Sequence, residues 1–160
     1  EGGAQAVKLE GGRRMVETVK AIVDMDVPVM GHIGLTPQSI HAMGGYKVQG
    51  KAKDAAEIFI DDAKELENAG AFAIVLECVP AELAKRITET ISIPTIGIGA
   101  GPHCDGQVLV INDMLGLDTG IPRPRFVQRY ADLNGVISSA VAAYIKDVED
   151  GDYPAKKHCY

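Results

Sequence analysis

The chain has 160 residues, of which 46% are hydrophobic and 24% charged, and its formal net charge is −6 at pH 7. This composition is typical of one soluble globular domain and excludes a disordered or fibrous chain, while the absence of a basic cluster argues against nucleic acid as a partner. No apolar run approaches the roughly 20 residues that a bilayer-spanning helix needs, and three widely spaced cysteines argue against a disulfide framework or a zinc site. We therefore expect a cytoplasmic protein with reduced thiols and no membrane partner.

Residues 6–12 form the first strand-like run, and they carry two charges on one face. Side chains alternate between the faces of a strand, so Lys8 and Glu10 point one way while their apolar neighbours point the other. Polar side chains at the carboxyl ends of parallel strands are where α/β barrels place their chemistry. Lys8 and Glu10 are therefore candidate site residues, and a salt bridge between them is the alternative.

Short apolar segments then alternate with helical patterns along the rest of the chain. The predicted strands cover residues 6–12, 27–34, 72–78, 93–99 and 107–113. The predicted helices cover residues 15–23, 55–66, 80–91 and 122–148, and a long glycine-containing loop covers 35–53. This alternation predicts a parallel sheet with right-handed crossovers, in one domain because no composition break divides the chain. The run 107–113 could instead start a helix.

Glu77 ends the apolar strand 72–78 and is the second candidate site residue. A carboxylate in that position opens onto the ligand cleft of an α/β sheet, where it could act as a general base. The alternative is that Glu77 caps the amino end of the helix that follows Pro80.

Two other features give weaker signals. His32 follows an apolar run, a position more typical of a hydrogen-bonded structural histidine than of a catalyst. The glycines of 97–101 suggest a phosphate or dinucleotide loop only superficially, because no helix start and no acidic residue complete that fingerprint. We interpret them as close backbone approach near a ligand or as plain turn geometry.

Several longer motifs occur together and in order: Val7–Gly12, Gly31–Gln38, Gly44–Gly50, Leu76–Pro80, Ile96–Gly101 and Asp105–Gln107. This combination resembles the 3-methyl-2-oxobutanoate hydroxymethyltransferase (ketopantoate hydroxymethyltransferase) family. The resemblance covers essentially the whole chain. It implies that residues 1–160 are the C-terminal part of a single (β/α)8 TIM barrel domain, roughly strands 4–8 with their helices, and that the N-terminal strands are absent.

The resemblance also implies an activity and its residues. Family members transfer a hydroxymethyl group from 5,10-methylenetetrahydrofolate to the small-molecule substrate 3-methyl-2-oxobutanoate, giving 2-dehydropantoate for pantothenate biosynthesis through a magnesium-stabilised enolate. Carried over to this sequence, Glu10 matches a Mg²⁺ ligand, Lys8 a contact to the keto acid, and Glu77 the proton acceptor. The resemblance further implies a cytoplasmic homo-oligomer, a decamer.

Other interpretations stay open. The remaining metal ligands of the family, two aspartates, come from the early strands that this chain lacks, so we expect this chain alone to be inactive and to need a complementing segment. A magnesium-dependent 2-oxo acid carbon–carbon lyase or mutase of the phosphoenolpyruvate type is one alternative function. An inactive fragment that serves only in assembly is another. The loop 44–50 and the motif after Glu77 favour the transferase.

Overall fold

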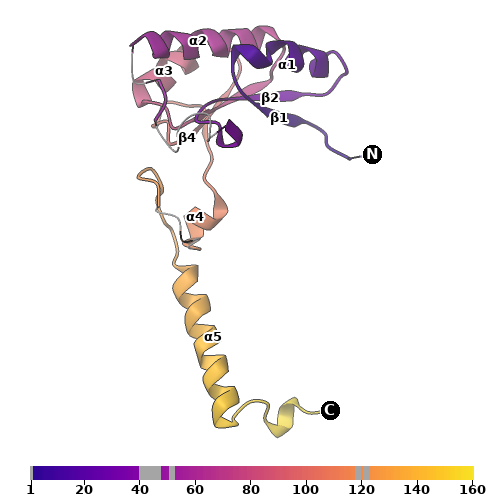
Figure 1. The fold of residues 1–160 in the computed structure, drawn as a ribbon, viewed down its shortest axis with the longest axis vertical. Coiled ribbons are helices and arrows are strands. Elements are labelled where there is room, and N and C mark those ends of the chain that lie inside the picture. Colours follow the sequence, from indigo (N-terminus) through magenta and orange to yellow (C-terminus); the bar gives the residue numbers. More distant parts are fainter. Residues whose placement is uncertain (1, 40–47, 51–52, 118–119, 121–122) are drawn as a thin grey trace. The chain divides into compact units, whose positions relative to one another are not determined.

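The structure, a computed structural model, describes residues 2–39, 48–50, 53–117, 120 and 123–160. The chain divides into two compact units, Glu1–Val108 and Leu109–Tyr160, and each is described by itself (Figure 1).

The first unit contains one sheet of parallel strands. Its order follows the chain, β1 to β5, and every neighbouring pair is parallel. The α/β prediction with a parallel sheet is thereby confirmed. The strands are β1 (Val7–Glu10), β2 (Val29–Gly34), β3 (Ala73–Glu77), β4 (Thr95–Ile98) and β5 (Gly106–Gln107).

The last predicted strand, 107–113, is wrong over most of its length. The structure has only the two-residue β5 there, followed by helix α4 (Ile111–Leu115). The helical alternative is the correct interpretation of that apolar run. A left-handed glycine, Gly116 with φ of 70°, ends the helix, as glycine commonly does after a last helical turn.

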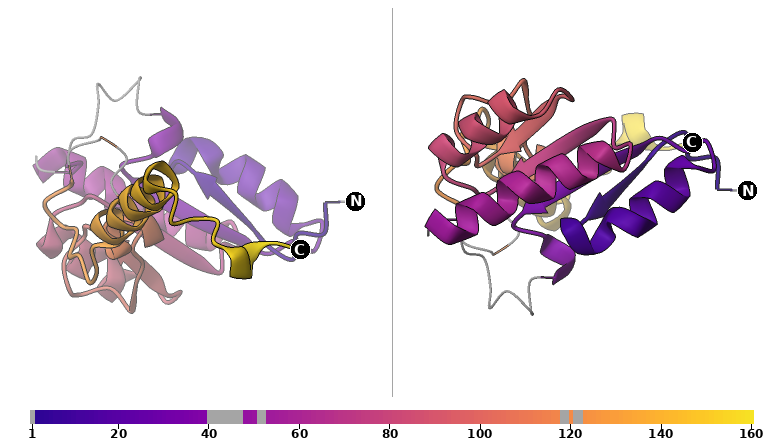
Figure 2. Two further views of the ribbon diagram at one scale, coloured as in Figure 1. Left: turned by 90° about the horizontal axis from the view of Figure 1, so that it is seen from below. Right: turned by 90° about the horizontal axis from the view of Figure 1, so that it is seen from above.

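Three helices of this unit lie on one face of the sheet. They are α1 (Val16–Val23), α2 (Lys53–Asn68) and α3 (Ala81–Thr90), preceded or joined by the short 3-10 turns η1 (Arg13–Met15) and η2 (Pro37–Ser39). Seen from above, the helices stand in front of the strands (Figure 2). α3 begins directly after Pro80, as the sequence predicts, because proline is tolerated where a helix starts.

The core lies between these helices and the sheet. Alternate strand residues such as Leu9, Ile33 and Leu76 join it, together with the fully buried Leu66 of α2 and Ile87 of α3. Because side chains alternate along a strand, the residues between them point to the opposite face of the sheet. The sequence of the strands thus separates an apolar, helix-facing side from a side that carries polar groups.

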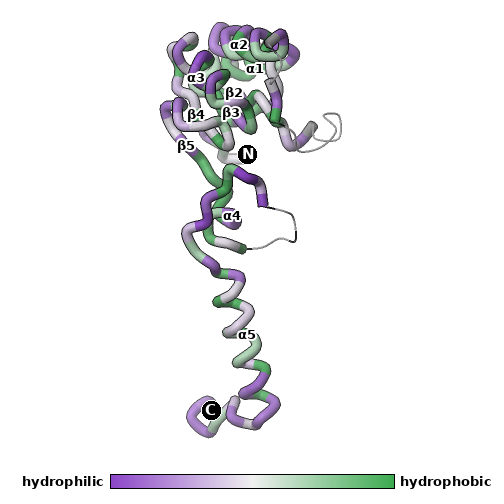
Figure 3. The backbone as a smooth tube through the Cα atoms, turned by 90° about the vertical axis from the view of Figure 1, so that its left-hand side faces the viewer, coloured by the Kyte–Doolittle hydropathy of each residue, from purple (hydrophilic) through white to green (hydrophobic). Residues whose placement is uncertain are grey.

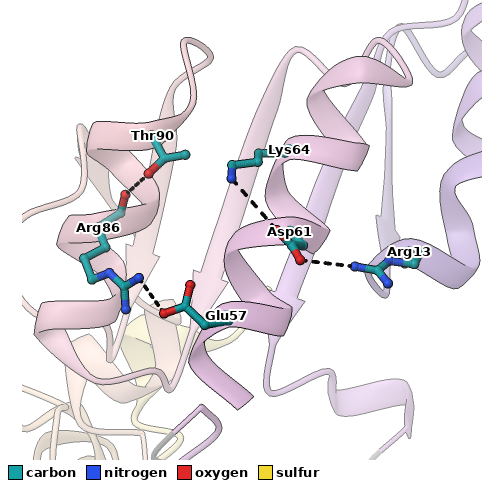
Figure 4. A network of polar contacts seen from close by, with 6 residues as sticks. All are labelled: Arg13, Glu57, Asp61, Lys64, Arg86 and Thr90. Atoms are coloured by element: carbon teal, nitrogen blue, oxygen red, sulfur yellow. Dashed lines mark hydrogen bonds and ion pairs between the residues drawn. The ribbon is translucent and has the colours of Figure 1, made fainter. Parts of the chain in front are cut away.

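The outer surface of the helix layer is charged. Arg13 and Lys64 approach Asp61 at 3.6 and 3.8 Å, and Arg86 of α3 pairs with Glu57 of α2 at 2.7 Å (Figure 4). These side chains are about half exposed, and exposed ion pairs contribute little to stability. We therefore interpret this network as a solvated helix surface.

The second unit contains α4, the long helix α5 (Leu133–Asp150) and the turn η3 (Lys156–His158). The predicted helix 122–148 thus starts 11 residues too early, about three helical turns. Asp132 caps α5, since its carboxylate accepts the backbone N–H of Gly135 at 3.2 Å. Apolar and polar residues alternate along α5 (Figure 3). Among the described residues, no helix combines the length and apolar character that crossing a membrane requires.

Candidate active site

Three polar residues from neighbouring strands meet on the face of the sheet opposite the helices. Glu10 ends β1 and lies in register with His32 of β2, while Glu77 ends β3 in register with Gly34. All three occupy strand positions that alternate with core residues, so their side chains share one face. They therefore converge at the carboxyl end of the sheet, where parallel α/β sheets bind ligands.

The buried ring of His32 lies between the two carboxylates. Its Nε2 atom is 3.1 Å from Oε2 of Glu77, and its Nδ1 atom is 3.8 Å from Oε1 of Glu10. The side chain of His32 is 2% exposed, against 10% for Glu10 and 15% for Glu77. The other oxygen of Glu10, Oε2, accepts the backbone N–H of Gln38 at 3.0 Å. Two carboxylates are thus held around one imidazole with little access to water.

The backbone around Glu77 is tightly constrained. Its carbonyl accepts the N–H of Leu35 at 2.8 Å, and a Cβ on Gly34, whose φ is +97°, would lie 2.2 Å from that carbonyl oxygen. The next residue, Cys78, has a φ of 50°, which is strained for a residue with a side chain. Its N–H donates to Ile98 of β4 at 2.9 Å. The strand end that carries Glu77 is therefore fixed by backbone hydrogen bonds to the chain on both of its sides.

Glu77 does not cap the following helix. The cap position of α3 is Pro80, and no side chain caps the helix there. The carboxylate of Glu77 instead lies against His32. The capping alternative is therefore wrong, and the position of Glu77 is compatible with a role as a base.

Cys78 is a weak candidate nucleophile. Burial, followed by the charge of Glu77, raises the pKa of the Cys78 thiol. A raised pKa reduces the thiolate fraction at neutral pH, and the thiolate is the reactive form. Cys78 is therefore a poor nucleophile at neutral pH.

Lys8 shares the face of Glu10 but lies two residues earlier on β1, where it is exposed. The alternative of a salt bridge between Lys8 and Glu10 is not found, because no ion pair joins these two described residues. The structure thus brings Glu10 and Glu77 together around His32 and leaves Lys8 at the edge of the site.

The comparison with known proteins identifies the family. The sequence model of the family described as ketopantoate hydroxymethyltransferase matches residues 1–156. The chain belongs to this family.

Relatives in the family are close in sequence but longer. Proteins named 3-methyl-2-oxobutanoate hydroxymethyltransferase are 62% identical in Geobacter metallireducens, 61% in Geobacter sulfurreducens and 58% in Clostridium novyi, each over 160 residues and all of this chain. The chain spans 60%, 60% and 58% of their lengths, respectively. This chain thus corresponds to about three fifths of the family members it matches.

A solved structure of an aldolase, YdjI from Escherichia coli K12, also matches. Its TM-score is 0.42 and its sequence identity 15%, over 95% of this chain and 52% of that one. That score is too low to indicate a shared fold, so the architecture rests on the elements described above.

The described residues of this family member do not by themselves hold Mg²⁺. No group of three or more His, Cys, Asp or Glu side chains among them is arranged for a metal ion. Mg²⁺ demands near-octahedral oxygen ligands, whereas Glu10 offers one carboxylate whose Oε2 already accepts a backbone hydrogen bond. The donor set among the described residues is incomplete, so Glu10 would contribute one ligand of several.

The loop Gly97–Gly101 serves packing. No helix starts at its third glycine, which excludes the dinucleotide fingerprint. A Cβ on Gly101, at φ +78°, would lie 2.4 Å from Cβ of Ala81, and Gln107 donates its side-chain amide to the Gly101 carbonyl at 3.0 Å. The structure thus favours turn geometry and close packing against the start of α3. In the loop motif 44–50, residues 44–47 lie outside the described residues.

His32 is the site residue that the sequence reasoning undervalued. A lone histidine on an apolar strand carries little information by itself. Its signal is its position in a series, because Glu10, His32 and Glu77 occur near the ends of three successive strands on one face.

Proposed function

We propose that the protein containing this chain transfers a hydroxymethyl group from 5,10-methylenetetrahydrofolate to 3-methyl-2-oxobutanoate, giving 2-dehydropantoate and tetrahydrofolate. The observation that carries the proposal is the meeting of Glu77, His32 and Glu10 at the carboxyl end of the sheet. It occurs in a chain that belongs to the ketopantoate hydroxymethyltransferase family. From the family resemblance we also expect a cytoplasmic homo-oligomer, a decamer.

Glu77 is the base in this proposal. The acidic proton of 3-methyl-2-oxobutanoate is on the carbon next to the keto group, and Glu77 removes it to leave an enolate. Water adds its oxygen to the methylene carbon of the folate, both bonds from that carbon to the two folate nitrogens break, and the enolate carbon bonds to the same methylene carbon. The proton taken by Glu77 and one proton of the water end on the two folate nitrogens, which gives tetrahydrofolate. A carboxylate that is largely shielded from water and fixed at a strand end suits this proton transfer.

In this proposal, Lys8 binds the keto acid and Glu10 binds Mg²⁺. Lys8 lies on the same face as Glu10 and is exposed, so its ammonium group is available to the carboxylate of the keto acid. Glu10 would supply one oxygen ligand to Mg²⁺, and the other ligands would come from parts of the protein outside this chain. A bound Mg²⁺ would polarise the keto group as a Lewis acid.

We further propose that this chain forms about strands 4–8 of a (β/α)8 barrel. Five parallel strands in sequential order, with the first three helices on one face, support this arrangement. The opposite face carries His32 and the two carboxylates, as the interior and rim of a barrel would. The chain's share of the relatives' length, about three fifths, agrees with a partial barrel.

The proposal is tested in a complemented chain, defined as this chain fused to the portion of the Geobacter metallireducens relative that it does not match. We expect it to form tetrahydrofolate only when both the keto acid and the folate are present. The substitution Glu77→Gln should lower kcat by roughly 10²-fold or more with little change in KM, because it removes the base.

The matched control is Glu82→Gln, an exposed glutamate in the first turn of α3, which should keep wild-type kcat. A complemented chain that is folded by circular dichroism but shows no turnover would contradict the proposed function and favour the inactive fragment. Equal kcat for wild type and Glu77→Gln would remove Glu77 from its role.

A further inference from the structure

The proposed function assigns no chemical step to His32, yet it is the most buried of the three site residues. Its ring is 2% exposed, and among the described residues neither nitrogen has a hydrogen bond of good geometry. A buried polar nitrogen without a partner costs free energy. The histidine therefore requires an explanation beyond packing.

We propose that His32 is a positioning residue that donates its Nε2–H to Oε2 of Glu77 and holds that carboxylate toward the substrate carbon. The inference rests on the proposed function, because it gives Glu77 a reaction to perform. The separation of 3.1 Å between these atoms is a hydrogen-bond distance. Catalytic hydrogen bonds are often poorly aligned without substrate and become aligned in the substrate complex.

The two distances indicate which ring nitrogen is placed to donate to a carboxylate. A neutral imidazole has one donor and one acceptor nitrogen. Nε2 lies 3.1 Å from a carboxylate oxygen, whereas Nδ1 lies 3.8 Å from the nearest one, beyond hydrogen-bond distance. A proton on Nε2 therefore has a carboxylate oxygen of Glu77 within reach, whereas Glu10 lies too far for a proton on Nδ1.

Glu10 is held independently of the histidine. Its Oε2 accepts the backbone N–H of Gln38, which fixes the carboxylate without using the His32 proton. The histidine can therefore serve Glu77 alone. Its own position is fixed by the β2 backbone, which pairs with β1 on one side and β3 on the other.

This arrangement gives the ring a defined effect on the reaction. A glutamate side chain has several rotatable bonds, and only some rotamers direct its oxygen at the substrate. A hydrogen bond from a rigid neighbour selects one of them before the proton transfer. Small misplacements of a reacting group can lower the rate by about 10²-fold.

Two substitutions in the complemented chain distinguish the nitrogens. In His32→Gln the side-chain amide reaches about as far as Nε2 and can still donate to Glu77. In His32→Asn the amide reaches only about as far as Nδ1. We expect His32→Gln to keep kcat close to wild type, and His32→Asn to lower kcat by roughly 10²-fold with KM nearly unchanged.

The control is His103→Gln, the same change at an exposed histidine, which should leave both constants unchanged. Equal losses in the two His32 variants would overturn the proposal, because reach to Glu77 would then not matter. A raised KM with an unchanged kcat would also overturn it, since His32 would then bind substrate rather than orient the base.

A second measurement does not depend on turnover. Long-range ¹H–¹⁵N correlation spectra of the complemented chain labelled with ¹⁵N-histidine should show the ring of His32, assigned with His32→Gln, in the Nε2–H tautomer. The Nδ1–H tautomer would overturn the proposal. If the wild type lacks transferase activity, the proposed function fails, while the tautomer still tests the contact between His32 and Glu77.

Discussion

Gly34 and Cys78 lie on either side of the Glu77 carbonyl and main chain at the carboxyl end of the sheet. Gly34 has a φ of +97° and leaves no room for a Cβ, and Cys78 has a φ of 50°. Both residues adopt backbone conformations that cost free energy for most side chains. The residue directly after Glu77 therefore holds a strained backbone conformation next to the carboxylate.

Gly34→Ala is expected to destabilise the protein and to reduce activity. The added Cβ would meet the Glu77 carbonyl oxygen at 2.2 Å, so β2 and β3 must separate at the site. We expect a loss of about 3 kcal/mol in the free energy of unfolding, measured by urea denaturation of the complemented chain, and a lower kcat. The control is Gly2→Ala, where a Cβ meets nothing within 4 Å; it should change neither the free energy of unfolding nor kcat. Equal stability of the two variants would contradict the steric conflict at Gly34.

His32 and Glu77 differ in how much the sequence could tell about them. Glu77 ends a clearly apolar strand, so its position at the sheet's edge could be predicted. The role of His32 depends on the register between β1, β2 and β3, which no local pattern gives. The strained backbone at Cys78 likewise could not be predicted from the sequence, because cysteine is not a residue type that favours a positive φ.

The strand pair β4 and β5 is joined by a polar cluster. The buried Thr95 donates its backbone N–H to Asp105 at 2.8 Å, and its hydroxyl lies 3.1 Å from the same carboxylate and 2.8 Å from the hydroxyl of Thr88. The backbone hydrogen bond from Thr95 is the main cause that holds the pKa of Asp105 below its ordinary value of 3.8. The cluster anchors the loop between β4 and β5 to helix α3, which carries Thr88.

Asp105→Asn should weaken this anchor in a pH-dependent way. A carboxylate whose folded pKa is lowered adds stability above pH 3.8, and that stability is lost as the pH falls through the lower folded pKa. We therefore expect a loss of about 1 kcal/mol near neutral pH, followed over the pH range by urea denaturation of the complemented chain. The difference from wild type should shrink below pH 3.8. Asp152→Asn, exposed in the second unit, is the control, and a difference that persists unchanged at low pH would contradict the account.

Elements with strong periodicity could be predicted from the sequence, and short or irregular ones could not. The strands at 29–34 and 73–77 and the helix α2 follow clear patterns. The strand prediction for residues 107–113 is wrong because a short apolar segment is compatible with either a strand or a helix. The predicted helix begins before α5 because apolar residues upstream of Asp132 extend the helical pattern back beyond Pro124. Asp132, a residue type that commonly caps helices, is the sequence signal for the correct start.

The first unit combines a parallel sheet whose helix-facing side is apolar with an opposite side that carries polar groups at the carboxyl ends of its strands. The alternation of side chains in the predicted strands indicated this division, and the parallel sheet confirms the α/β fold class. The complete barrel is a proposal, because this chain spans about 60% of its relatives. Glu10 likewise needs partners from outside the chain to hold a metal ion, which the described residues do not provide.

In the proposed reaction, Glu77 removes the proton next to the keto group of 3-methyl-2-oxobutanoate. The most direct measurement is the exchange of that proton with deuterium from D₂O, followed by ¹H NMR in the complemented chain, without folate and with Mg²⁺ in every sample. We expect the wild type and Glu82→Gln to catalyse this exchange, and Glu77→Gln to show an exchange rate about 10²-fold lower. Exchange at the wild-type rate in Glu77→Gln would contradict it.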